Sequence, residues 1–160
     1  MPGKPLKILH VLRAPVGGLF RHVLDVAQGQ AARGHQVGIV AASGGGANAD
    51  ERLNALAPDL GLGVHRLQMK RQPGVSDVMA TRDVARIIAS LRPDIAHGHG
   101  AKGGAFARLA ASRPTIRVYT PHGGSLHYGR NTPAGLIYGT AERFLMRRTE
   151  LFLFESEFAR

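Results

Sequence analysis

The sequence contains no cysteine and no tryptophan, and only 6% of its 160 residues are aromatic. Without cysteine, neither a disulfide nor a thiolate metal site can stabilise the fold, so a reducing cytoplasm is the simplest compartment. Proteins that bind nucleic acid interleave aromatic side chains with basic ones so that bases can stack on them. The scarcity of aromatic residues therefore argues against nucleic acid as a partner.

Long hydrophobic runs are also missing. No stretch reaches about 18 apolar residues, the length that a membrane span requires. The apolar run after Lys7 is only about six residues long and contains His10, so it lacks the apolar region of a signal peptide. With 44% hydrophobic residues, the chain can bury one core but is too short for two ordinary domains. We expect one cytoplasmic domain over residues 1–160.

Acidic residues are few, because 11 Asp and Glu stand against 21 Lys and Arg, which gives a formal net charge of +10. No carboxylate occurs between Asp94 and Glu142, although that stretch holds several basic residues and four histidines. This stretch is expected to face negative charge, such as phosphates or acidic lipid surfaces. The alternative is a solvated basic surface that only keeps the protein soluble.

Strand and helix patterns alternate along the chain. Short apolar or β-branched runs predict strands at residues 7–13, 36–42, 63–67, 94–97, 115–120 and 151–154. Helical spacing of apolar residues, with glycine or proline stops, predicts helices at 19–34, 76–91, 101–112 and 134–148. Loops or turns are predicted at 43–49, 98–104 and 121–133, and the cap and first turn of a further helix at 156–160.

This alternation predicts right-handed βαβ units and a parallel sheet covered on both faces, an α/β Rossmann-like fold. In the last helix, Ile137, Ala141, Phe144 and Leu145 are expected to face the core, and the strand at 151–154 is expected to be buried. Ligands of such sheets bind at the carboxyl ends of the strands, so function should lie on the strand-to-helix loops.

The first such loop contains Gly17 and Gly18. Two glycines let a ligand approach the backbone closely, and the start of the following helix offers free N–H groups to an anion. Arg21 and His22, one turn into that helix, add donors that a purely structural turn would not need. The alternative is a turn that only lets strand and helix pack closely.

The second loop contains a literal G-x-G-x-x-G between His97 and Gly104. A nicotinamide site would need an acidic residue about 20 positions later, and none is present, so a dehydrogenase is disfavoured. Lys102 is followed by glycine, which excludes a nucleotide-triphosphate P-loop. A phosphate-binding turn remains, with Lys102 and His99 as donors. His97 and His99 lie two apart and would point to the same side, but no third zinc ligand stands nearby in sequence.

The third loop follows the predicted strand at 115–120. His122, between proline and glycine, can donate to a hydroxyl or a phosphate oxygen and titrates near neutral pH. Tyr128 and Arg130, in the same loop, are candidates for lining a polar sugar or phosphate site. The alternative is that His122 only hydrogen-bonds its own loop.

Four segments taken in order carry a resemblance to a known family: ILHVLRAPVGGLFRHVLDVAQGQAARGHQV, PDIAHGHGAKGGAFARLAA, VYTPHGG and AERFLMRRTELFLFESE. Together they resemble the amino-terminal domain of family 4 (group 1) retaining glycosyltransferases with the GT-B fold. The resemblance implies that this domain binds a sugar or lipid-linked glycan acceptor while a second domain binds a nucleotide-sugar. It also implies transfer without a metal ion or another cofactor.

Residue roles follow from the same resemblance. Gly17 and Gly18 would face the donor diphosphate and the acceptor, and His122 would contact the transferred sugar or the acceptor near the reaction centre. His99 and Lys102 match an acceptor-side loop. The second domain is not among these 160 residues, so we expect the chain alone to have little or no turnover.

Two further expectations remain open. Arg143 and Arg147 are four positions apart, with Arg148 adjacent, and a helical face carrying them could rest on anionic lipid at the inner side of the membrane. The competing function is a nucleotide- or phosphate-binding Rossmann-like module without transferase activity.

Overall fold

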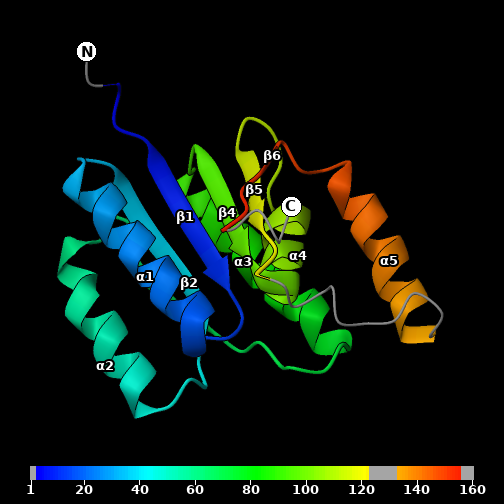
Figure 1. Cartoon of the computed structure of the whole chain (residues 1–160). Coiled ribbons are helices and arrows are strands. Elements are labelled where there is room, and N and C mark those ends of the chain that lie inside the picture. The colour runs from blue at the N-terminus through cyan, green and yellow to red at the C-terminus, as the bar shows by residue number, and fades with distance from the viewer. Residues whose placement is uncertain (1–2, 123–132, 156–160) are drawn as a thin grey trace.

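A computed structural model describes residues 3–122 and 133–155 of the chain (Figure 1). Its six strands form one parallel sheet: β1 (Lys7–Leu12), β2 (Gln36–Ala42), β3 (Gly63–Leu67), β4 (Ile95–His99), β5 (Ile116–Thr120) and β6 (Leu151–Phe152). The helices are α1 (Gly17–Ala32), α2 (Ala47–Leu56), α3 (Val75–Leu91), α4 (Gly100–Ala110) and α5 (Pro133–Met146), with a 3₁₀ turn η1 (Ala57–Asp59) after α2. The predicted α/β Rossmann-like sheet is confirmed.

The strand order β3-β2-β1-β4-β5-β6 reverses its direction between β1 and β4. These two strands pair in parallel, with Leu12 opposite His99 at their carboxyl ends. Loops that leave adjacent strands in opposite directions open a crevice at such a reversal, and ligands of open α/β sheets bind there. The fold therefore places the loops after β1 and β4 on either side of one crevice.

Helices cover both faces of the sheet, and strand residues alternate between them. Leu9 and Val11 of β1 belong to the core cluster that includes residues of α3 and α4. Leu12 belongs to the opposite cluster, together with Phe20 and Val23 of α1. His10, between Leu9 and Val11, therefore points towards the α1 face. A polar side chain at this position requires partners inside the core.

Three glycines let α4 lie unusually close to the sheet. A Cβ on Gly98 would stand 2.5 Å from the Cα of Gly104, and one on Gly103 would stand 2.5 Å from the backbone oxygen of Val11. A Cβ on Gly104 would collide with the ring of Tyr119. The glycines of the G-x-G-x-x-G segment thus serve helix–sheet packing.

A buried arginine joins α4 to α5. Arg108 is fully buried, and its guanidinium donates to both carboxylate oxygens of Glu142 at 2.7 and 3.2 Å. It also donates to the Gly104 backbone oxygen at 2.9 Å and lies 3.8 Å from the centroid of the Tyr119 ring. A buried guanidinium needs such complete pairing, because an unpaired buried charge is very costly.

Two predicted loops were wrong. Helix α2 begins inside the segment expected to be a loop, because Gly46, with φ +78°, ends the glycine run and Ala49 and Leu53 bury one helical face. The turn expected at 98–104 is absent, since β4 extends to His99 and α4 begins at Gly100, where φ is +65°.

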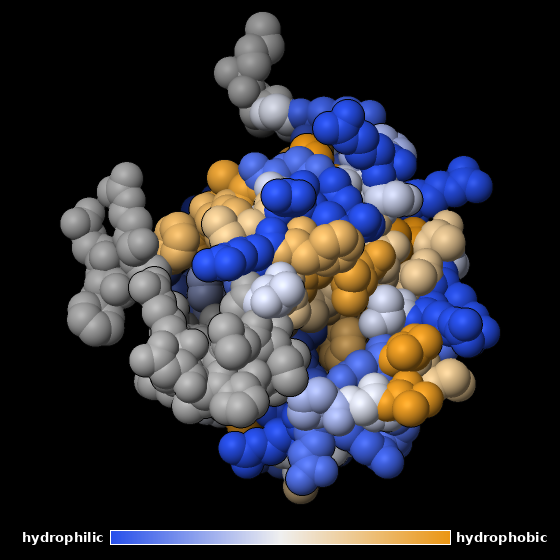
Figure 2. All heavy atoms as spheres, turned by 90° about the vertical axis from the view of Figure 1, so that its right-hand side faces the viewer, coloured by the Kyte–Doolittle hydropathy of each residue, from blue (hydrophilic) through white to orange (hydrophobic). Residues whose placement is uncertain are grey.

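The carboxyl-terminal part is less buried than predicted. Leu145 is buried, but Ala141 and Phe144 are exposed, and Ile137 lies outside the side chains that the structure describes. The last strand is confined to Leu151–Phe152 at the edge of the sheet, and Leu151 is 48% exposed. Figure 2 shows the side of the molecule that carries α5 and this edge, where apolar residues lie among hydrophilic ones. The predicted helix start at 156–160 lies outside the described residues. Among residues 3–122 and 133–155, no helix has the length and apolar character needed to cross a bilayer.

Gly103→Ala is expected to destabilise the fold by about 1–3 kcal/mol, because the new methyl group would meet the backbone of β1, which cannot move aside as a side chain can. Gly29→Ala is the matched control, since it lies in α1 and its Cβ would meet only the end of the Arg33 side chain. That control is expected to be neutral or stabilising, because alanine favours helix. Urea unfolding measures both variants, and equal stability for the two would contradict the packing role of Gly103.

Candidate functional site

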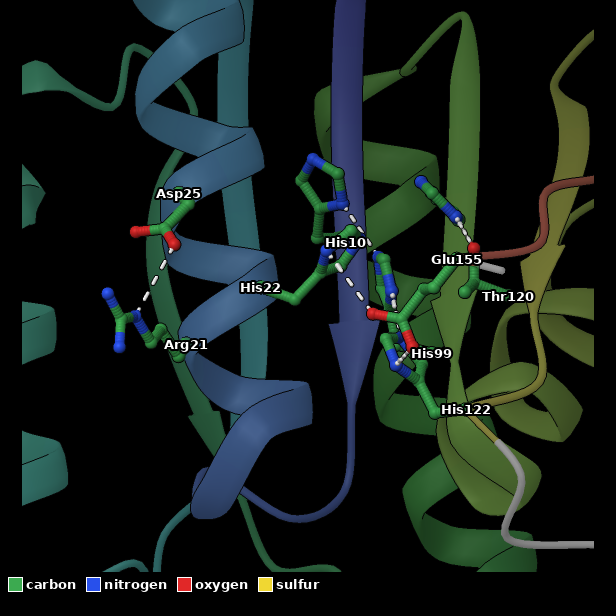
Figure 3. A network of polar contacts seen from close by, with 9 residues as sticks. His10, Arg21, His22, Asp25, His99, Thr120, His122 and Glu155 are labelled. Atoms are coloured by element: carbon green, nitrogen blue, oxygen red, sulfur yellow. Dashed lines mark hydrogen bonds and ion pairs between the residues drawn. The ribbon is translucent and has the colours of Figure 1, made fainter. Parts of the chain in front are cut away.

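Five histidines gather around the paired strands β1 and β4 (Figure 3). His10 comes from β1 and His22 from α1, while His97 and His99 end β4 and His122 directly follows β5. Ring centroids of His22 and His122 lie 5.3 Å apart, as do those of His99 and His122. Residues predicted on three separate loops thus meet at one rim of the sheet.

Five polar side chains, Gln30, His10, His99, His122 and Glu155, form a continuous hydrogen-bonded chain. His10 Nε2 lies 2.8 Å from Gln30 Oε1, and His10 Nδ1 lies 2.9 Å from His99 Nε2. The other nitrogen of His99 lies 3.1 Å from His122 Nε2. The chain ends at a carboxylate, because His122 Nδ1 lies 2.8 Å from Glu155 Oε2.

Two more histidines border this chain. The second carboxylate oxygen of Glu155 lies 3.2 Å from His22 Nδ1, so Glu155 joins His22 to His122. His97 Nε2 lies 2.8 Å from the Thr120 hydroxyl, and the His97 and His99 ring centroids are 4.0 Å apart. The prediction that His97 and His99 point to the same side is confirmed.

Burial holds the inner histidines neutral. It is the main reason why the pKa of His10 is lowered to about 4, against the opposing hydrogen bond with Gln30, and why the pKa of His97 is lowered to about 2; neighbouring imidazoles contribute in both cases. Burial also lowers the pKa of His99 well below its ordinary value. Burial lowers the pKa of His122 too, against the opposing effect of Glu155. Desolvation disfavours the charged form, so His10, His97 and His99 are neutral at neutral pH.

The neutral chain fixes the direction of every hydrogen bond. A neutral imidazole donates from one nitrogen and accepts at the other, and a carboxylate only accepts. His122 therefore donates from Nδ1 to Glu155 and accepts at Nε2 from His99, which in turn accepts from His10. In the structure, however, the Gln30 atom that faces His10 Nε2 is the amide oxygen, which only accepts, so this bond has His10 donating to Gln30 and runs against the direction set by a neutral His122.

Protonation of His122 reverses this direction. With protons on both nitrogens, His122 donates to His99 as well as to Glu155, so His99 donates to His10 and His10 donates to Gln30. Gln30 must then present its oxygen, which is the orientation in the structure. The orientation of Gln30 in the structure therefore matches a His122 that carries protons on both nitrogens.

Two sets of three residues have metal-ligand geometry within the described part of the chain: His10 with His97 and His99, and His22 with His122 and Glu155. In each set, one potential ligand atom per residue lies within 4.8 Å of the others. Imidazole and carboxylate are suitable zinc ligands. However, the nitrogens of His10 and His99 are already engaged with one another and with Gln30 and His122, so a metal would have to displace these bonds. The absence of a metal from the reaction stays a prediction.

The backbone at His122 is unusual. Its φ is +52°, in the left-handed region that only glycine, asparagine, aspartate and histidine adopt at all readily. Such a conformation costs about 1–3 kcal/mol and is maintained only by its surroundings. The side chain is 6% exposed, with partners on both nitrogens. The bonds to His99 and Glu155 are therefore what hold His122 in place.

The predicted glycine turn lies open beside this cluster. Gly17 begins α1 with φ +69°, and a Cβ on either Gly17 or Gly18 would meet nothing within 4 Å. These glycines differ from those of α4, whose missing side chains make room for other parts of the protein. The amino-terminal turn of α1 is thus accessible to a ligand.

Other predicted site residues lie elsewhere. Arg21 is 77% exposed, pairs with Asp25 at 3.8 Å and projects away from the histidines in Figure 3. Lys102 uses its three donors on the backbone oxygens of Lys70 and Gln72 and on Asp77, at 2.8, 2.9 and 2.6 Å. Contact of Arg21 or Lys102 with a ligand stays a prediction.

Tyr128 and Arg130 lie outside the described residues.

Residues 95–141, the stretch without carboxylates, do not form the free basic surface that the sequence suggested. Glu142 pairs with Arg108 and Glu150 pairs with Arg117, so carboxylates just beyond the stretch neutralise cations inside it. Asp77 does the same for Lys102. The correction has a simple cause, since ion pairs form across the fold between residues that are distant in sequence.

Sequence reasoning missed His10, Gln30 and Glu155 as members of the site. A usable signal existed for His10, because a polar residue inside an otherwise apolar buried strand requires an internal partner. Neither Gln30 nor Glu155 gave such a signal, since they stand among other polar residues.

A family model described as the glycosyl transferase 4-like domain matches residues 17–160. Among solved structures, a glycosyltransferase from Rickettsia africae is 21% identical with a TM-score of 0.56, over 75% of this chain and 30% of its own. MurG from Acinetobacter baumannii is 18% identical with a TM-score of 0.62, over 96% of this chain and 42% of its own. A protein described as a UDP-N-acetylglucosamine 2-epimerase from Listeria monocytogenes is 13% identical with a TM-score of 0.67, over 97% of this chain and 40% of its own.

No curated protein matches the sequence. The chain spans less than half the length of each of these three structures. At such identities the structures establish only the fold, which is the Rossmann-like half of a GT-B architecture.

The stability of the fold is expected to fall in acid because of the buried histidines. Their folded pKa values lie below the ordinary 6.5, so the unfolded state binds more protons and unfolding becomes easier as pH falls below about 6.5. As the pH falls below about 6.5, each such histidine lowers the free energy of unfolding by up to about 1.4 kcal/mol per pH unit. For His10 this loss continues down to pH about 4. Urea unfolding between pH 7 and about 5 measures the slope.

His97→Gln can preserve the bond to Thr120 while removing one titrating group. The slope of the unfolding free energy against pH should then fall by the amount that corresponds to one bound proton. Arg82→Gln, a change of one exposed charge on α3, should leave the slope unchanged. An identical slope for His97→Gln and the unsubstituted protein would contradict the buried neutral state of His97.

Proposed function

Because the chain belongs to the glycosyl transferase 4-like family, we propose that it is the acceptor-binding half of a retaining glycosyltransferase. The enzyme would move a sugar from a nucleotide-sugar to a glycan or lipid-linked acceptor. The observation that carries this proposal is the meeting of His22, His99 and His122 beside the strand-order reversal, with the open Gly17–Gly18 turn at the start of the helix that carries His22. A reaction centre in a two-domain transferase needs an open rim of this kind, against which a second domain closes.

The amino-terminal turn of α1 suits the donor diphosphate. Its glycines leave the backbone N–H groups accessible, and the helix dipole places partial positive charge at the same point. These groups would stabilise the negative charge that develops on the departing nucleoside diphosphate. In this proposal the nucleotide-sugar is a co-substrate held mainly by a donor-binding domain, and the reaction uses neither a metal ion nor another cofactor.

His122 is proposed to contact the transferred sugar or the acceptor hydroxyl. Its strained backbone and its bonds to His99 and Glu155 fix the ring in one position at the rim. Both nitrogens have partners in the structure, so a substrate hydroxyl would take the place of one of them, while the other partner keeps the ring oriented. Glu155 requires a proton on Nδ1 of His122, and His99 and His10 act as positioning residues, because their chain of bonds holds the other side of the ring.

Contact with an anionic membrane surface stays a proposal as well. Arg143 and Arg147 are exposed, but α5 ends at Met146, so the two arginines do not share the helical face that was predicted. Arg148 turns inward and donates to the Arg108 backbone oxygen at 3.1 Å. Sedimentation with anionic and with neutral vesicles would test whether Arg143 and Arg147 contact a membrane. Equal binding to the two kinds of vesicle would contradict the proposal.

His122→Asn tests the proposed role in transfer. Asparagine tolerates the left-handed backbone, so the fold should persist while the imidazole is lost. In a protein that also carries a donor-binding domain, kcat for sugar transfer should fall by about 100-fold or more. Arg82→Gln, on an exposed arginine of α3, should leave kcat unchanged.

The 160-residue chain alone should show little or no transfer from a nucleotide-sugar, because half of the reaction centre is missing from it. Brisk transfer by this chain, or full activity of His122→Asn in the two-domain protein, would contradict the proposal.

A further inference from the structure

A hollow lies at the carboxyl ends of three strands, on the same rim of the sheet as the histidine cluster. It has a volume of about 310 Å³ and is formed by the segments that follow β1, β2 and β3. Its walls are residues 13–16, 42–45, 68, 69 and 71. Because the first of these segments leads directly into Gly17, the hollow adjoins the open start of α1.

The charge of the hollow is positive and uncompensated. Arg13 and Arg71 are the ionisable residues in its lining, and no carboxylate lines it. Neither arginine has an ion pair or a side-chain hydrogen bond within residues 3–122 and 133–155. By contrast, Arg66 nearby in sequence is paired with Asp50 at 2.8 Å. Two arginines that line one cavity without a counterion give it a positive potential that favours an anion.

The shape of the hollow is maintained by close packing of its walls. A Cβ on Gly45 would stand 2.5 Å from Cγ of Pro15 and 2.6 Å from the Cβ of Ala49, so glycine lets the loop after β2 lie against the loop after β1. Gly44, beside it, is open, since a Cβ there would meet nothing within 4 Å. The volume lies at the lower end of the range of small-molecule pockets, roughly 300–1,000 Å³, which suits one sugar phosphate and not an oligosaccharide.

We propose that this hollow binds a phosphate group carried by the acceptor, with Arg13 and Arg71 as its ligands. The proposal rests on the acceptor-binding function put forward above and narrows the acceptor to a phosphorylated one, such as a lipid-linked or phosphorylated sugar. Guanidinium groups match phosphate oxygens with paired hydrogen bonds, and two of them balance the double negative charge of a phosphate monoester. The Gly17–Gly18 turn directly follows residues 13–16 of the hollow and begins the helix that carries His22.

Titration of the chain with inorganic phosphate and with a hexose phosphate, followed by NMR or calorimetry, tests the site. Both probes should bind, and glucuronate, which carries a single carboxylate, should bind more weakly. Arg13→Gln and Arg71→Gln should each weaken phosphate binding about tenfold. Arg82→Gln, which removes the same charge from an unpaired exposed arginine of α3, is the matched control and should change the Kd less than twofold.

Arg71→Lys keeps the charge but not the paired hydrogen bonds, so it should bind phosphate with intermediate affinity. Far-UV circular dichroism establishes that each variant is folded. Three results would overturn the site. One is an unchanged Kd for phosphate in the Arg13→Gln/Arg71→Gln double variant, and another is a loss of phosphate affinity in Arg82→Gln as large as in the Arg13 and Arg71 variants. The third is tighter binding of glucuronate than of phosphate. Phosphate binding by this chain without transfer by the two-domain protein would contradict the glycosyltransferase function and leave the site standing.

Discussion

The need to bury neutral imidazoles with every nitrogen satisfied organises this molecule. His10 and His99 are almost completely buried at the strand-order reversal, where each nitrogen left without a partner would be costly. Their bonds to Gln30 and His122 tie β1, β4, α1 and the end of β5 to one another. The same requirement keeps these rings uncharged, so the centre of the sheet carries a polar network without a buried charge.

The same requirement explains why the rim of the sheet has two regions of different charge. The histidine cluster is polar but nearly neutral at its core, whereas the hollow lined by Arg13 and Arg71 carries positive charge without a counterion. The open turn at Gly17 directly follows residues 13–16 of the hollow and begins the helix that carries His22. Neutral groups suit the orientation of sugar hydroxyls, and cationic groups suit phosphates, so the two regions are chemically complementary.

Local sequence patterns predicted most of the architecture, and long-range partners account for most of what they missed. The strands Gln36–Ala42 and Gly63–Leu67 and the shared side of His97 and His99 follow from periodicity, which is a local property. The partners that complete the site were not visible locally, since His10 and His99 are 89 positions apart. Arg117 lies in the stretch without carboxylates, and its partner Glu150 is 33 positions away.

The most direct test of the coupled histidine chain is a nitrogen-15 NMR titration of its imidazoles. At neutral pH, His10 and His99 should be uncharged and should both carry their proton on Nδ1, the direction set by the Glu155 carboxylate. When His122 takes up a proton, both should change to the Nε2 form together. A charged His10 or His99 at neutral pH, or tautomers that do not respond to His122, would contradict the account.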